Sequence, residues 1–84
     1  MANLPPELAA KIERAPNAPV DLIVRLKDDP SAHLNELESL GWTVRRTFSL
    51  TPSVAIQGPA SASLALAKKT WVLAIEEDKP VHTM

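Results

Sequence analysis

The 84-residue sequence contains no cysteine and no tyrosine, and it has only two glycines, two tryptophans and one phenylalanine. Without cysteine, neither disulfides nor a thiolate metal site can compensate for the small core of so short a chain. The sequence also lacks the run of about 20 apolar residues that a membrane-spanning helix needs, and its start lacks a secretory signal. We therefore expect a cytoplasmic protein that makes no membrane contact and folds by packing alone.

An excess of charge of one sign is also missing. Nine lysines and arginines stand against ten aspartates and glutamates, which gives a formal net charge of −1. Domains that bind nucleic acid usually carry a clustered basic excess, so the balance argues against a nucleic-acid partner.

The sequence shows none of the residue groups that an enzyme or a metal site requires. No nucleophile with a base and no pair of carboxylates with separate roles is evident. The two histidines, His33 and His82, lack metal-ligand spacing and are expected to be solvated. We predict that the protein is not an enzyme and holds no metal or cofactor.

The N-terminal part is expected to be an extension with a short helix over residues 5–14. Two prolines and an asparagine then interrupt the helical pattern, so residues 1–18 are predicted to lie outside the domain proper. Apolar alternation over residues 20–26 predicts the first strand of that domain.

A helix followed by a second strand is predicted next. Asp29 and Pro30 suit the start of a helix, and Gly41 suits its left-handed end. Residues 42–50 then alternate as a strand with four apolar side chains on one face, Trp42, Val44, Phe48 and Leu50. Arg46 falls on that apolar face, so either the strand leaves the core there or a bulge is present, and the sequence leaves both open.

The remaining pattern predicts a third strand over residues 53–57, a second helix over residues 60–69 and a fourth strand over residues 72–77. Leu64 and Ala67 are expected to face inward from the helix, and Leu73 and Ile75 from the strand. The order β-α-β-β-α-β predicts an α+β, ferredoxin-like fold. Such a fold has a four-stranded antiparallel sheet with both helices on one face, and here the N-terminal extension is added to it.

Two segments resemble the opening and closing patterns of the inhibitor I9 family, which comprises subtilisin propeptides and free-standing fungal inhibitors of subtilisin-like proteases. Residues 21–29 are similar to the opening, a hydrophobic strand followed by lysine and aspartate. Residues 75–84 are similar to the closing pattern, a strand that ends in Glu-Glu-Asp before a tail. The resemblance covers about residues 20–84 and divides the chain into an extension over residues 1–18, an I9-like domain over residues 19–79 and a tail over residues 80–84.

The resemblance implies a serine protease of the subtilisin type as partner. In the family the bare sheet face packs on two surface helices of the protease, and acidic residues that match Glu76 and Asp78 cap the N-termini of those helices. The tail enters the substrate cleft as a cleaved product does. Met84 would occupy the S1 pocket, with the three preceding residues in S2 to S4 in the order Thr83, His82 and Val81.

The sequence leaves three functions open. The preferred one is a free-standing protease inhibitor, monomeric when free, because the strands and caps are well formed and no catalytic domain follows. The second is a cleaved, exported prodomain that templates the folding of its own subtilisin. The third is a ferredoxin-like interaction module without a protease link. An RNA-binding version would need exposed aromatics on the middle strands, whereas Trp42, Phe48 and Trp71 are predicted to be core residues.

Overall fold

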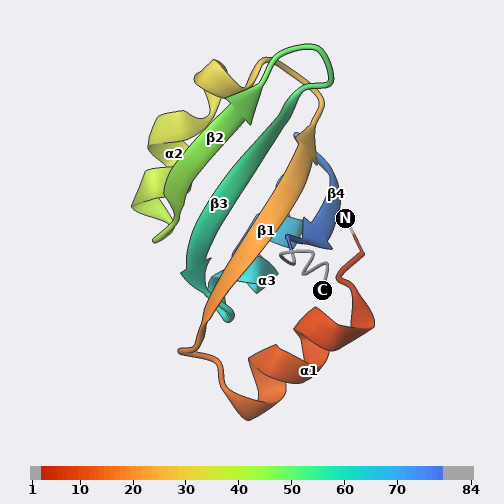
Figure 1. Ribbon diagram of the computed structural model, residues 1–84, viewed down its shortest axis with the longest axis vertical. Helices are drawn as coiled ribbons and strands as arrows, with labels where there is room; N and C mark the ends of the chain where they lie inside the picture. The colour runs from red at the N-terminus through yellow and green to blue at the C-terminus, as the bar shows by residue number, and fades with distance from the viewer. Residues whose placement is uncertain (1–2, 79–84) are drawn as a thin grey trace, which may run out of the picture.

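A computed structural model describes residues 3–78 as an α+β fold with a single four-stranded sheet (Figure 1). The elements in chain order are helix α1 (Pro6–Arg14), strand β1 (Pro19–Leu26), a 3-10 turn (Pro30–Ala32), helix α2 (Leu34–Ser39), strand β2 (Thr43–Phe48), strand β3 (Ser53–Pro59), helix α3 (Ala62–Ala67) and strand β4 (Val72–Glu77). No helix within these residues combines the length and apolar character needed to cross a membrane.

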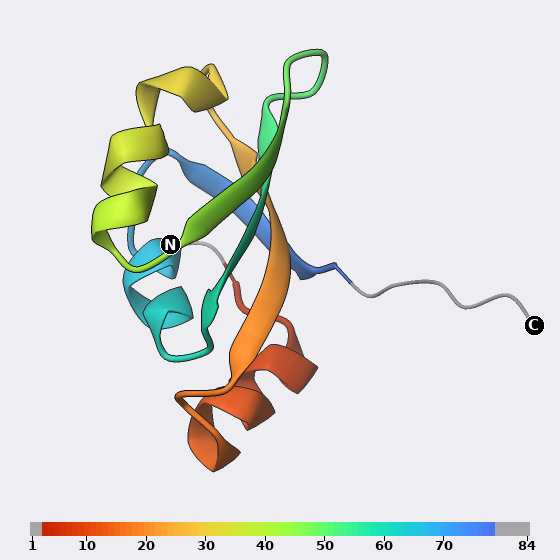
Figure 2. The same ribbon diagram turned by 60° about the vertical axis from the view of Figure 1, so that its left-hand side comes forward.

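The sheet has the strand order β2-β3-β1-β4, and all three pairings are antiparallel. Strands β1 and β3 are therefore central, and β2 and β4 form the edges. Helices α2 and α3 lie on the same side of the sheet, while α1 lies beyond its lower end (Figure 2). The opposite side, here called the open face, bears Asp21, Ile23 and Arg25 of β1 and is not covered by α2 or α3.

The core lies between the sheet and the helices, and β1 supplies it as its alternation predicts. Its four inward side chains are all buried: Val20, Leu22, Val24 and Leu26. Trp42 is also buried, as predicted, beside Gly58 of β3. A β-carbon at Gly58 would lie 2.7 Å from the indole ring, so this glycine makes room for the tryptophan.

Helix α1 shares the core of the sheet. Leu8 is fully buried within the same apolar cluster, and Leu4 and Ile12 pack against that cluster. The Lys11 ammonium group donates to the Glu77 carboxylate of β4 at 3.1 Å. Helix α1 therefore contributes to the same core as the sheet.

The predicted inward residues of the last helix and strand are partly wrong. Helix α3 is shorter than predicted and buries Ser63, Leu66 and Ala67, which leaves Leu64 exposed. In β4 the pairing with β1 skips one residue, because Arg25 pairs with Ala74 whereas Leu26 pairs with Val72. Leu73 is the extra residue of this bulge and is 56% exposed, while Ile75 is buried as predicted.

His33 was predicted to be solvated, but it is held between α2 and β4. Its ring stacks on Trp71, with centroids 4.0 Å apart and planes within 9°. Its Nε2 lies 3.3 Å from the Asp28 carboxylate, and only 12% of its side chain is exposed. The sequence pattern missed this contact because Trp71 is distant from His33 along the chain.

Asp29 caps the 3-10 turn that leads into α2, as predicted. Its Oδ1 accepts from the backbone N–H of Ser31 at 2.9 Å and from the Ser31 hydroxyl at 2.8 Å. These hydrogen bonds, the backbone one first, hold the pKa of Asp29 below its usual value. A carboxylate with a lowered folded-state pKa stabilises the fold above its unfolded pKa, and this contribution is lost as pH falls through the folded pKa.

We therefore expect the stability difference between the wild type and Asp29→Ala to shrink as the solution is acidified. Urea unfolding of both proteins from neutral to acidic pH measures that difference. A difference that stays constant over this range would show that the cap acts without its charge.

Candidate functional site

The open face is organised in three rows that run across the strands. Strand register defines each row from β4 to β2. The first row begins with Asp78, whose N–H donates to the Asp21 carbonyl at 2.8 Å, and continues through Gln57 to Thr43. The Arg45 side chain reaches this row by donating to the Gln57 side-chain oxygen at 3.4 Å. The second contains Glu76, Ile23, Ala55 and Arg46, and the third contains Ala74, Arg25, Ser53 and Phe48.

A β-bulge in β2 shapes the basic side of this face. Val44 pairs with Ile56, but the next pair joins Arg46 to Ala55, so Arg45 is an extra residue in the ladder. Successive residues of a regular strand point to opposite faces. Because of the bulge, Arg45 and Arg46 instead both line the open face. Of the two explanations that the sequence left open for Arg46, the bulge is confirmed.

The same bulge moves Phe48 out of the predicted core. After Arg45 the alternation is inverted, so Phe48 pairs with Ser53 on the open face and is 39% exposed. Strand β2 ends at Phe48, and Leu50 is fully exposed in the turn that follows. The prediction that Phe48 and Leu50 are core residues is therefore wrong.

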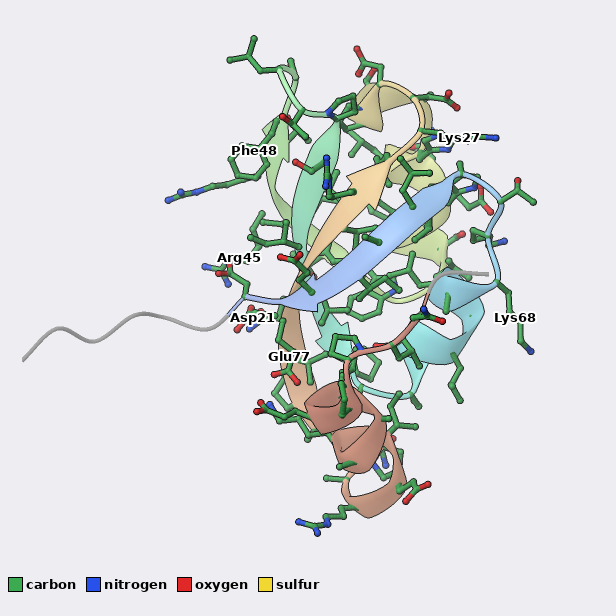
Figure 3. All side chains as sticks on the ribbon, turned by 90° about the vertical axis from the view of Figure 1, so that its right-hand side faces the viewer. Asp21, Lys27, Arg45, Phe48, Lys68 and Glu77 are labelled. Carbon is green, nitrogen blue, oxygen red and sulfur yellow. The ribbon has the colours of Figure 1, made fainter. Side chains whose placement is uncertain are left out.

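The centre of the open face is a shallow hollow of about 530 Å³. The aliphatic residues that line it are Ile23, Ala55 and Ile56. Arg45, Arg46 and Phe48 border it on the β2 side, and Asp21 and Asp78 border it on the side of β1 and β4. Figure 3 shows Asp21, Arg45 and Phe48 on one side of the molecule, with Lys27 and Lys68 on the other.

The acidic run at the end of β4 is divided between the two faces. Glu76 pairs with Ile23, so both Glu76 and Asp78 belong to the open face, and both are exposed. Glu77 points the other way, with only 8% of its side chain exposed, and binds Lys11. Glu76 and Asp78 thus share a face as predicted, although Leu73 does not mark the opposite phase.

Charge is distributed unevenly across the open face. The β2 edge carries Arg45 and Arg46, and the β4 edge carries Glu76 and Asp78. None of these four side chains forms a salt bridge with another of the residues that the structure describes. Their charges are therefore available to a partner.

The other predicted site residues lie outside the described part of the chain. They are Val81, His82, Thr83 and Met84. Within residues 3–78, no group of three His, Asp or Glu side chains is placed to hold a metal ion. The sequence pattern indicated no function for Arg45 or Phe48. The one sign of their placement was Arg46, which falls on the apolar phase of the strand and so indicates a break in the alternation.

Comparison with known families finds no family whose model matches the chain. No curated protein matches it either.

Proposed function

We propose that the chain is a proteinaceous inhibitor of a subtilisin-like serine protease, of the inhibitor I9 type and resident in the cytoplasm. The observation that carries the proposal is the position of Glu76 and Asp78. Both are exposed on the open face, at the end of the edge strand that leads into residues 79–84. The open face thus carries two acidic groups close to the point where the chain continues into residues 79–84.

The fold proposed for this function is the ferredoxin-like one. Read from the other edge, the strand order is β4-β1-β3-β2, with α2 joining β1 to β2 and α3 joining β3 to β4. Both helices lie on one side of the sheet (Figure 2). This split βαβ arrangement leaves the other side available to a partner.

Acidic side chains at the β4 edge suit the N-termini of helices. The first N–H groups of a helix have no partner within it, and together they carry a partial positive charge. Glu76 and Asp78 have no basic partner among the described residues, so each can accept such N–H groups. We infer that the two acids cap the N-termini of two neighbouring helices on the protease.

The tail adds the second half of the inhibitory mechanism. An extended segment can pair with the edge of a substrate cleft while alternate side chains enter its pockets. With Met84 in the S1 pocket, the free carboxylate lies beside the catalytic serine and no scissile bond is offered. Because four residues alone bind weakly, the open face must supply most of an interface on the order of 1,600 Å².

The packing of α1 supports an inhibitor over a cleaved prodomain. Leu8 of α1 and Leu22 of β1 belong to one continuous buried cluster. We expect a domain with such a core to fold without its target, as a free-standing inhibitor must do to resist digestion. A prodomain that folds only on its protease does not have this requirement.

The acidic pair is tested by the double variant Glu76→Gln and Asp78→Asn. We expect it to weaken inhibition of subtilisin by roughly 0.6–2 kcal/mol in total at low salt, because each capping charge contributes about 0.3–1 kcal/mol. The difference should diminish as salt screens the charges. Inhibition constants measured at two ionic strengths provide the test.

The matched control is Glu13→Gln with Glu38→Gln, which removes the same charge from exposed positions on α1 and α2. We expect this control to inhibit like the wild type. Equal inhibition by the two double variants would show that Glu76 and Asp78 do not touch the protease.

A further inference from the structure

The bulge in β2 places two consecutive arginines on one face of the sheet. A regular strand would have turned one of them toward the helices. Arg45 and Arg46 instead both border the central hollow, and both are exposed. Bulges often re-aim side chains beside functional sites, so the two arginines that this bulge re-aims are candidates for a functional contact.

The two guanidinium groups are not used to hold the described fold together. Arg45 donates one long hydrogen bond of 3.4 Å to Gln57, which directs it along the open face. Neither Arg45 nor Arg46 forms a salt bridge among the described residues. Phe48, from the same edge strand, is 39% exposed at the same hollow. Arginine and aromatic side chains are enriched among the residues that contribute most to protein interfaces.

We propose that Arg45, Arg46 and Phe48 form a second contact region that binds acidic side chains of the protease and determines which subtilisin-like enzymes are inhibited. The inference rests on the function proposed above and adds a requirement to it. The acidic β4 edge would bind positive helix N-termini of the protease, whereas the basic β2 edge would bind protease carboxylates that lie beside an apolar surface. A protease that meets only the first requirement binds more weakly.

A carboxylate-bearing protein suits this region better than a nucleic acid does. The planar guanidinium group can bind a carboxylate through two parallel hydrogen bonds. Phosphate groups are also bound by arginine, but the chain carries a formal net charge of −1 and lacks the clustered basic excess that binding of a phosphate backbone requires. The central strands carry Ile23 and Ala55 where an RNA-binding sheet carries stacking aromatics.

The test compares three double variants of the full chain against at least two subtilisin-like proteases that the wild type inhibits. Arg45→Glu with Arg46→Glu reverses both charges. Lys27→Glu with Lys68→Glu makes the same change in net charge on the far side of the molecule (Figure 3). Arg45→Lys with Arg46→Lys keeps the charge and removes the planar geometry. Thermal unfolding of each variant confirms that it is folded.

We expect the arginine reversal to raise the inhibition constant about 10- to 100-fold, by a factor that differs between the proteases. The lysine reversal should change it less than about threefold, and the arginine-to-lysine pair should fall between the two.

Three results would overturn the inference. If the two reversals weaken inhibition equally, only net charge matters, and the proposed function stands without this contact region. If the arginines instead mediate self-association or binding of single-stranded RNA while inhibition is unchanged, the region has another occupant. If the folded wild type inhibits none of the proteases, the proposed function and this inference fail together.

Discussion

Replacing Met84 by aspartate is expected to raise the inhibition constant about 10- to 100-fold, which corresponds to roughly 1–3 kcal/mol of binding free energy. The proposed S1 pocket is apolar, so a carboxylate at this position must be desolvated there without a partner. Removing residues 81–84 altogether should weaken inhibition at least as much. Inhibition assays against subtilisin measure both changes.

The melting temperature separates this effect from a loss of folding. The tail follows the last strand, so we expect the variant and the truncated chain to unfold at the wild-type temperature. Leu64→Asp is the control for Met84→Asp in the inhibition assay. It also changes an exposed apolar residue to aspartate, but on α3, on the far side from the open face. Full inhibition by the truncated chain would remove the tail from the mechanism.

Leu8→Ala is expected to destabilise the fold by about 2–5 kcal/mol, the usual range for truncating a buried leucine. Leu8 is fully buried in the cluster that also contains Leu22 and Leu66. Total stabilities of small domains are of the order of 5–15 kcal/mol, so this single change removes a large share. Urea unfolding followed by tryptophan fluorescence measures the change.

Leu64→Ala makes the same truncation at a position that is 48% exposed and should change the stability by less than about 0.5 kcal/mol. Equal effects of the two variants would mean that α1 does not belong to the core. Residues 1–18 would then lie outside the domain proper, as the sequence alone predicts.

The regular parts of the fold follow from local patterns in the sequence. The alternation of β1 predicts which of its side chains are buried, because both neighbours pair with it in regular register over most of its length. Asp29 and Gly41 mark the limits of the segment that contains α2, and Gly41 has the positive φ of 103° expected of a left-handed end. The Asp29 and Gly41 signals depend on residues close in the chain.

Errors in the burial of strand residues occur where the pairing between strands changes the phase. One extra residue in β2 and one in β4 invert the alternation, so that Phe48 and Leu73 point away from the core. Sequence periodicity indicates a bulge only where a residue falls on the wrong phase, as Arg46 does, because the bulge itself depends on the partner strand. The same limit applies to Leu8, whose burial depends on the docking of α1 against the sheet.

The candidate site, like the fold, was predicted only where the strand alternation is regular. Spacing of two places Glu76 and Asp78 on one face of any strand, and the structure has both on the open face. The basic side of that face was not predicted, since Arg45 and Arg46 share a face only because of the bulge. The arginine at position 46, on an apolar phase, was the one sign of this bulge in the sequence.

The most direct test of the proposed function is a steady-state inhibition assay of the intact chain against subtilisin, with mass spectrometry of the chain after incubation. We predict competitive inhibition at near-stoichiometric concentrations, with the chain recovered uncut, as expected of a product-like inhibitor. Absence of inhibition, from a chain shown by circular dichroism to be folded, would contradict the proposal. Rapid digestion of the chain by the protease would contradict it equally.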